Sequence, residues 1–118
     1  MTAPLTNAST DIRIAAIDIG SNSVRQIVAD VSPTGQIRVV DEMKAMPRLG
    51  EGLEATGALS PTAIDAAVTA VQRMVTLADQ LGAIRIEIVA TSAVRDAANS
   101  ADFTGQVLTR TGRRVRIL

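Results

Sequence analysis

The chain has 118 residues, about the length of one small domain. Hydrophobic residues make up 47% of the chain and aromatic residues 1%, so the core must consist of aliphatic side chains. Lys and Arg total 12, as do Asp and Glu. The resulting net charge of zero argues against a general nucleic-acid binder, which normally carries a basic excess.

The sequence contains no cysteine and no histidine. Disulfides, thiolate metal sites and cysteine nucleophiles are therefore excluded. The Ser-His-Asp arrangement and imidazole metal ligands are excluded as well. Any chemistry within this chain must use carboxylates, hydroxyls, arginines, Lys44 or backbone amides.

Residues 1–11 have neither the basic start nor the apolar block of a signal peptide. We expect a disordered N-terminal tail there and a single domain over residues 12–118. No apolar run is long enough to cross a membrane. These features favour a cytoplasmic protein that binds neither DNA nor membranes.

Three strands are predicted in the first part of the domain. "IRIAAIDIG" (12–20) is apolar on both faces, which is typical of a central strand. "SVRQIVADV" (23–31) and "QIRVVDEMKAM" (36–46) follow after short turns. Strands joined by short turns pair antiparallel, so these three form a meander.

A glycine-rich connection (48–60) leads into the strongest helix signal of the chain. Ser60 suits the N-cap and Pro61 the first helical position. Apolar residues then recur at helical spacing as far as Leu81, and Gly82 ends the helix.

The remaining segments predict a strand over 84–91, a short helix or turn over 92–98, and a last strand that begins in 113–118. Ser100 is expected to cap a helix over 101–111, which Gly112 ends. We expect the strand after the long helix to be parallel to its neighbour. The order β-β-β-α-β-α-β predicts an α/β domain with helices packed on a mixed sheet.

The segment from Asp18 to Ser23 is the first candidate site. Gly20 permits close approach to the backbone, and the turn amides can form a concave nest for a phosphate. Ser21, Asn22 and Ser23 add side-chain donors, whereas Asp18 suits a magnesium ion. The alternative is a polar β-turn whose side chains cap their own backbone.

The second candidate, "ATSAVR" (90–95), follows a predicted parallel strand, where open α/β sheets place their ligands. Thr91 and Ser92 lie at the end of that strand, and Arg95 can bind an anion through two hydrogen bonds. The alternative is that Ser92 caps a short helix while Arg95 pairs with Asp96 or water.

Two further segments stay open between function and plain structure. In "RLGEG" (48–52), Arg48 is a candidate phosphate contact beside Glu51, but such a loop is more often a connection. Four arginines near the end of the chain form either a solvated face or a polyanion contact: Arg110, Arg113, Arg114 and Arg116.

The stretches "AAIDIGSNSVR" (15–25), "RLGEGLEATGALS" (48–60) and "VATSAVRDAAN" (89–99), in this order, resemble the exopolyphosphatase/guanosine pentaphosphate (pppGpp) phosphatase family. This family belongs to the actin-like ATPase superfamily. The resemblance implies the first of two ribonuclease-H-like domains, with a mixed five-stranded sheet of order 3-2-1-4-5.

The resemblance also implies hydrolysis of the terminal phosphate of polyphosphate or pppGpp with Mg²⁺. Gly20, Ser21, Asn22 and Ser23 then bind phosphate together with Thr91 and Arg95, and Asp18 serves the metal. The family's catalytic glutamate and second phosphate loop have no counterpart here. Both are expected beyond Leu118, so no catalytic residue is assigned within the chain.

Three hypotheses follow from the sequence. The first is the N-terminal domain of a phosphohydrolase, inactive alone because its general base and partner domain are absent. The second is a non-catalytic module that binds phosphate or an alarmone, or docks to a partner chain. The third, a sugar-kinase or chaperone-type ATPase domain, is disfavoured by "GSNS" and "TSAVR". An exposed cleft face also suggests self-association, with a homodimer as one outcome.

Overall fold

The computed structural model describes residues 10–118, so the expected tail at 1–11 lies outside the described residues except for its last two positions. Along the described chain the elements are β1 (Ile12–Ile19), β2 (Val24–Val31), β3 (Ile37–Ala45), α2 (Leu53–Thr56), α3 (Pro61–Gln80), β4 (Arg85–Ala90), α4 (Ser92–Asp96), α5 (Ser100–Thr111) and β5 (Val115–Ile117).

The five strands form one mixed sheet in the order β3-β2-β1-β4-β5, with β1 at its centre. β1 pairs antiparallel with β2, and β2 pairs antiparallel with β3, which confirms the predicted meander. β4 lies parallel to β1 and β5 lies parallel to β4. The sheet order expected from the family resemblance is therefore confirmed.

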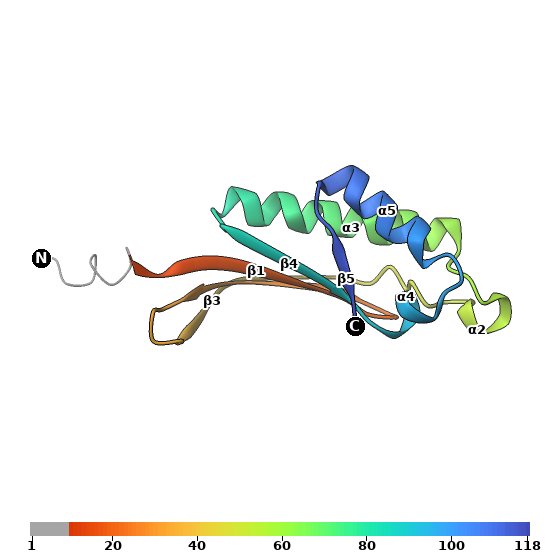
Figure 1. Ribbon diagram of the computed structural model, residues 1–118, viewed down its shortest axis with the longest axis horizontal. Coiled ribbons are helices and arrows are strands. Elements are labelled where there is room, and N and C mark those ends of the chain that lie inside the picture. Colours follow the sequence, from red (N-terminus) through yellow and green to blue (C-terminus); the bar gives the residue numbers. More distant parts are fainter. Residues whose placement is uncertain (1–9) are drawn as a thin grey trace, which may run out of the picture.

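Helices α3 and α5 pack on the same side of the sheet (Figure 1). The core between them is aliphatic, as the composition predicted, apart from the fully buried Phe103. Its largest fully buried members include Ile17, Ile19, Ile64 and Met74.

Helix α3 forms as the sequence predicted because both of its ends are specified locally. The Ala63 N–H donates to the Ser60 hydroxyl oxygen at 3.1 Å, and Pro61 occupies the first turn. The helix ends at Gln80, and Gly82 follows with a φ of 81°. One face of the helix is buried along its whole length, which orients it on the sheet.

The opposite face of the sheet is not covered by a helix of the described chain (Figure 1). Ile12, Ile37 and Val39 lie 48%, 70% and 51% exposed. β1 is thus central, but its two faces differ. Ile17 is buried beneath the helices, whereas Asp18 on the other face is exposed.

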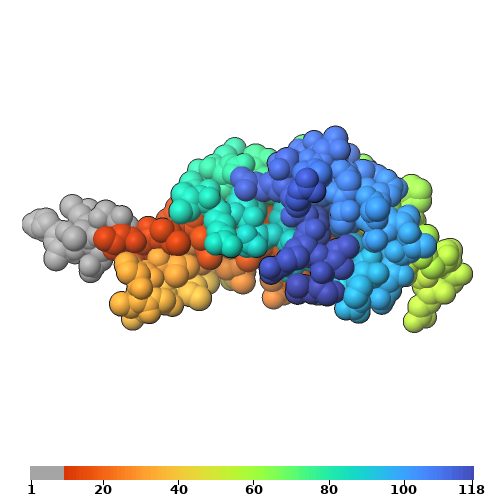
Figure 2. All heavy atoms as spheres, viewed as in Figure 1, coloured from red at the N-terminus to blue at the C-terminus, as the bar shows by residue number. Residues whose placement is uncertain are grey.

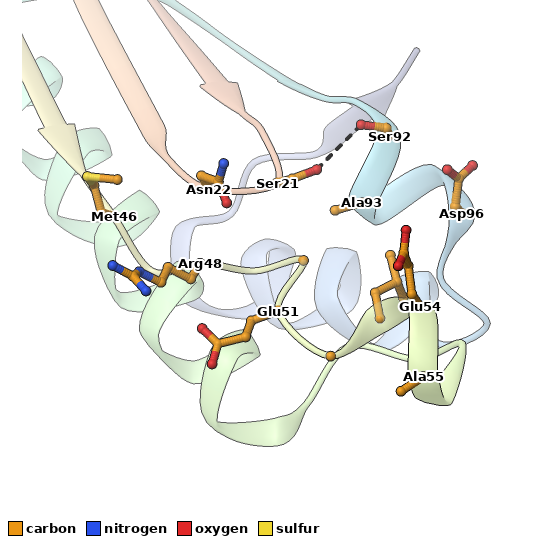
Figure 3. A pocket seen from close by; sticks show the side chains of 13 residues that line it. Ser21, Asn22, Met46, Arg48, Glu51, Glu54, Ala55, Ser92, Ala93 and Asp96 are labelled. Carbon is orange, nitrogen blue, oxygen red and sulfur yellow. Dashed lines mark hydrogen bonds between the residues drawn. The ribbon is translucent and has the colours of Figure 1, made fainter.

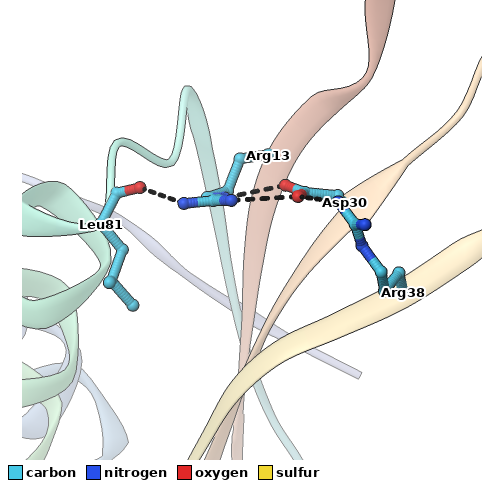
Figure 4. Close-up of polar contacts among 4 residues, drawn as sticks. All are labelled: Arg13, Asp30, Arg38 and Leu81. Carbon is cyan, nitrogen blue, oxygen red and sulfur yellow. Dashed lines mark hydrogen bonds and ion pairs between the residues drawn. The ribbon is translucent and has the colours of Figure 1, made fainter. Parts of the chain in front are cut away.

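An ion-pair cluster closes the end of the sheet where β1 begins. The Arg13 guanidinium donates to both carboxylate oxygens of Asp30, at 2.8 and 3.0 Å, and to the Leu81 carbonyl oxygen at 2.9 Å (Figure 4). Arg38 donates to the same carboxylate at 3.1 Å. The cluster therefore joins three strands to the end of α3.

Two local predictions require correction. The connection 48–60 contains a short helix, α2, between Gly52 and Gly57, both of which have a positive φ. Ser100 does not cap α5, because it is already the first helical residue. The preceding Asn99 instead bonds the backbone of Leu59 through both its side-chain oxygen and nitrogen, at 2.8 and 2.9 Å.

Within residues 10–118, no helix combines the length and apolar character that crossing a membrane requires.

Candidate functional site

The candidate phosphate-binding segment is the tight turn between β1 and β2, residues 20–23, which we call the phosphate loop. The Gly20 N–H donates to the Ser23 carbonyl oxygen at 2.9 Å and closes the turn. Within the described residues, the N–H groups of Ser21, Asn22 and Ser23 make no backbone hydrogen bond. Three consecutive amide donors thus remain available to an anion.

Gly20 is not required by the backbone conformation, because no residue of the phosphate loop has a positive φ. An αR–αL nest is therefore not formed, and the donors come from an ordinary turn. A Cβ at Gly20 would meet only the Ser23 carbonyl oxygen, at 3.4 Å.

A second segment holds the phosphate loop in place through its backbone. The Arg48 N–H donates to the Asn22 carbonyl oxygen at 3.1 Å, and the Gly50 N–H donates to the Ser21 carbonyl oxygen at 2.8 Å. Leu49, between these two donors, is completely buried. Residues 48–52, which we call the clamp loop, are therefore part of the site and not only a connection.

Gly50 packs closely against Ser21 and Ala93. A Cβ at this position would lie 3.1 Å from the Ser21 Cβ and 3.5 Å from the Ala93 Cβ. The first distance is tighter than ordinary van der Waals contact, so Ser21 would have to shift. Glycine at position 50 thus allows the clamp loop to pack between the phosphate loop and α4.

The end of β4 joins the site from the other side. The Thr91 N–H donates to the Ile19 carbonyl oxygen at 3.2 Å, which continues the β1–β4 pairing up to the phosphate loop. The Ser92 and Ser21 hydroxyl oxygens lie 3.4 Å apart. The structure thus places Thr91 and Ser92 beside the phosphate loop, as the predicted sheet edge requires.

An open pocket of about 920 Å³ lies between the phosphate loop, the clamp loop, α2 and α4 (Figure 3). Figure 2 shows α2 at the end of the molecule, next to the residues of α4. The pocket is lined by side chains and backbone of Ser21, Asn22, Met46, Arg48, Gly50, Glu51, Gly52, Leu53, Glu54, Ala55, Ser92, Ala93 and Asp96. Three of these are carboxylates and one is a cation.

Asp18 lies on the uncovered face of the sheet and does not line this pocket. Its direct cross-strand neighbour on β2 is Arg25, whose neighbour on β3 is Lys44. Cross-strand neighbours present their side chains on the same face, so one carboxylate and two cations share the sheet surface next to the phosphate loop.

The Arg95 side chain is bonded to residues outside the phosphate loop. Its Nε donates to the Asp96 carboxylate at 3.2 Å, and its Nη1 donates to the Leu118 carbonyl oxygen at 3.4 Å. It does not line the pocket, whereas Asp96 does. The Arg95–Asp96 pair is the structural alternative that the sequence left open, and phosphate binding by Arg95 stays a prediction.

Sequence reasoning missed several members of the site. Arg25 was recognisable from its spacing. The predicted strand begins at Ser23, and residues two apart on a strand present their side chains on the same face. Glu54 and Asp96 reach the pocket only because α2 and α4 meet there. No local sequence signal predicts that meeting.

The sequence matches the Ppx/GppA phosphatase family over residues 13–118. The chain belongs to this family. Exopolyphosphatase 2 of Mycobacterium tuberculosis (strain ATCC 25618 / H37Rv) is 40% identical over 94 residues, which cover 77% of this chain and 30% of that protein. Exopolyphosphatase 1 of Mycobacterium leprae (strain TN) is 32% identical over 107 residues, which cover 91% of this chain and 32% of that protein.

Solved structures of the family share the fold. The crystal structure of the Aquifex aeolicus Ppx/GppA family member matches with a TM-score of 0.87 and 30% sequence identity, over 92% of this chain and 35% of that one. The fold is therefore the actin-like, ribonuclease-H-like fold that the family resemblance implied. The chain spans about a third of the length of the relatives that it matches.

Proposed function

We propose that this chain is the phosphate-binding N-terminal domain of a cytoplasmic phosphohydrolase that removes the terminal phosphate of inorganic polyphosphate, pppGpp or both. Membership of the Ppx/GppA phosphatase family supports the reaction class. The names of the mycobacterial relatives support polyphosphate as a substrate. The net charge of zero gives no long-range attraction by which to choose between the two polyanions.

The observation that carries this proposal is the row of unpaired donors in the phosphate loop. The N–H groups of Ser21, Asn22 and Ser23 have no backbone partner in the described part of the chain. The Ser21 and Ser92 hydroxyl groups, 3.4 Å apart, lie beside these amides. Backbone amides held in one orientation bind an anion without the conformational cost that flexible side chains incur.

Asp18 is the residue that fits magnesium. Mg²⁺ is commonly held by one or two carboxylates, phosphate oxygens of the substrate and several waters. The described residues contain no group of three or more acidic side chains that could hold a metal by themselves. A single carboxylate beside a phosphate loop matches this kind of site, in which the substrate phosphates and water would supply the other ligands. The metal would then neutralise charge on the phosphate oxygens.

We further propose that the isolated chain binds the substrate but does not hydrolyse it. The family resemblance implies that the general base and the second phosphate loop lie beyond Leu118. Loss of a general base typically reduces the rate about 100- to 10,000-fold. Phosphoryl transfer also needs charge stabilisation on both sides of the transferred group.

Calorimetric titration of the chain with tripolyphosphate in the presence of Mg²⁺ tests the binding function. We expect saturable binding, which Ser21→Ala weakens because one donor is lost. Thr76→Ala, on the solvent-facing side of α3, is the matched control and should bind like the wild type. Absence of binding to the wild-type chain would contradict the proposal.

A measurement of phosphate release distinguishes the phosphohydrolase domain from the alternative, a non-catalytic module that binds phosphate or an alarmone. The chain alone and a protein extended by the following coding residues are incubated with long-chain polyphosphate and Mg²⁺. We expect release only from the extended protein. No release from either would favour the binding module, and equal release from both would contradict the need for a partner domain.

A further inference from the structure

The Arg48 backbone has an unusual conformation next to the phosphate loop. Its φ is 52°, and it is the one non-glycine residue with a positive φ among the described residues. This left-handed conformation is unfavourable for a residue with a Cβ, and such strain is concentrated at functional sites. Glycine or asparagine would adopt it more readily, so the backbone does not explain the choice of arginine.

The clamp loop fixes where the Arg48 side chain begins. The Arg48 N–H is bonded to the Asn22 carbonyl oxygen, and the adjacent Leu49 side chain is completely buried. The Arg48 Cα is thereby tied to the phosphate loop itself and not to a freely moving connection. A guanidinium on this anchor stays within reach of whatever the phosphate loop binds.

The Arg48 guanidinium has no internal anion to neutralise it. Among the described residues it forms none of the ion pairs and no side-chain hydrogen bond. Arg95, by contrast, is paired with Asp96, and Arg25, which also lies near the phosphate loop, does not line the pocket. An exposed guanidinium without a partner is available for a ligand anion.

Two of the three carboxylates of the pocket, Glu54 and Asp96, lie away from its one cation (Figure 3). Arg48 is the only cation among the lining residues, whereas Glu51, Glu54 and Asp96 are acidic. Figure 3 shows Arg48 beside Met46 and below Asn22, and Glu54 near Asp96 toward α2 and α4. Arg48 therefore attracts an anion to the phosphate-loop end, where Glu51 also lies, and Glu54 and Asp96 repel an anion from the end near α2 and α4.

We propose that Arg48 directly binds a phosphate group of the polyanionic substrate held at the phosphate loop. Arg48 thereby sets the position of the terminal part of the substrate. This inference rests on the proposed function, because it needs a phosphate at residues 20–23. Arginine suits the role, since its planar guanidinium can donate two parallel hydrogen bonds to a phosphate. Glu54 and Asp96 disfavour a position of the anion nearer to α2.

Calorimetric titration with Mg²⁺–tripolyphosphate of the wild-type chain, Arg48→Asn, Arg48→Lys and Arg73→Gln tests this inference. Asparagine tolerates a positive φ, so Arg48→Asn removes the charge without adding backbone strain. We expect Arg48→Asn to weaken binding about tenfold, the loss of one charge-assisted hydrogen bond. Arg48→Lys should retain part of the affinity. Arg73→Gln removes the same charge from an exposed position on α3 and should have little effect.

The outcomes separate the two proposals. Binding by the wild type with unchanged affinity in Arg48→Asn would overturn the role of Arg48 and leave the proposed function standing. Absence of binding to the wild type would overturn both. A urea unfolding midpoint of Arg48→Asn equal to or above that of the wild type, together with lost affinity, would support direct phosphate binding over a purely structural role.

Discussion

The Gly50 N–H donates to the Ser21 carbonyl oxygen at 2.8 Å, and this hydrogen bond joins two segments that lie almost thirty positions apart in the chain. This hydrogen bond occupies a carbonyl oxygen of the phosphate loop. Within the described residues it leaves the N–H groups of Ser21, Asn22 and Ser23 without a backbone partner. A Cβ at Gly50 would lie 3.1 Å from the Ser21 Cβ, so Ser21 would have to shift to admit it. Ligand binding at the phosphate loop should therefore depend on a glycine that contributes no side chain to the site.

Gly50→Ala tests this dependence. The added methyl group displaces Ser21, so we expect weaker tripolyphosphate binding and a modest loss of stability, about 1 kcal/mol or more. Gly105→Ala is the matched control, because a Cβ there meets no atom within 4 Å and the residue lies inside α5. It should stabilise the chain by about 0.5–1 kcal/mol and leave binding unchanged. Unchanged binding in Gly50→Ala would contradict the role of the clamp loop in positioning the phosphate loop.

Asp18→Asn should abolish the effect of magnesium on anion binding. In the wild type we expect Mg²⁺ to strengthen tripolyphosphate binding, because an ion held by the Asp18 carboxylate would neutralise charge on the phosphate oxygens. The variant should lose this increase yet bind tripolyphosphate without Mg²⁺ at least as well as the wild type, because a repelling charge is gone.

Glu87→Gln is the control for Asp18→Asn. Glu87 lies opposite Ala16 on the parallel strand β4 and is exposed, so the variant removes one carboxylate from the same face of the sheet. Calorimetric titrations with and without Mg²⁺ should give the wild-type magnesium effect for this variant. An equal loss in both variants would indicate a general charge effect and would argue against a metal at Asp18.

Gln26→Leu should stabilise the fold. Gln26 on β2 is completely buried, and neither its side-chain oxygen nor its nitrogen has a hydrogen-bond partner. It lies opposite Ile17, on the helix-covered face. A buried polar group without a partner costs about 1–3 kcal/mol, and leucine fills a similar volume without that cost. Urea unfolding should therefore show a higher midpoint, and a lower one would indicate that the amide has a partner.

Asp30 should make stability depend on acid pH. The hydrogen bond from Arg13, aided by Arg38, lowers the pKa of the Asp30 carboxyl from 3.8 to about 2, although burial opposes this shift. Because the pKa is lower in the folded chain than in the unfolded one, the carboxylate stabilises the fold above about pH 4. This stabilisation is lost as the pH falls from about 4 to about 2.

Urea midpoints of the wild type and Asp30→Asn, measured near neutral pH and at about pH 2.5, check the acid dependence. The variant should be less stable near neutral pH, because Arg13 loses its charged partner. It should also lose less stability on acidification than the wild type. Parallel losses in the two proteins would assign the acid sensitivity to other carboxylates.

The predictable parts of the fold are those with local signals. Ser60 and Pro61 set the start of α3, and its apolar spacing set the face that packs on the sheet. The short turns of the meander fixed the antiparallel pairs. In these cases the determining contacts join residues a few positions apart, so the sequence pattern alone carries them.

The parts that could not be predicted depend on contacts between distant segments. Serine is a common N-cap residue, so Ser100 was expected to precede α5. Instead the helix begins at Ser100, and the preceding Asn99 bonds Leu59, forty positions away in the chain. The clamp between Arg48 and Asn22 likewise has no signal in either segment. The residues of the phosphate loop were recognisable, whereas the carboxylates that complete the pocket depended on where α2 and α4 meet.

The central claim is that the phosphate loop binds a polyphosphate anion through its backbone amides. Titration of the ¹⁵N-labelled chain with Mg²⁺–tripolyphosphate, followed by amide chemical shifts, tests it most directly. We expect the largest saturable shifts at Ser21, Asn22 and Ser23, and small shifts at the distant Arg13–Asp30 cluster. Shifts centred instead on the arginines at 110–116, with the loop amides unmoved, would contradict the claim.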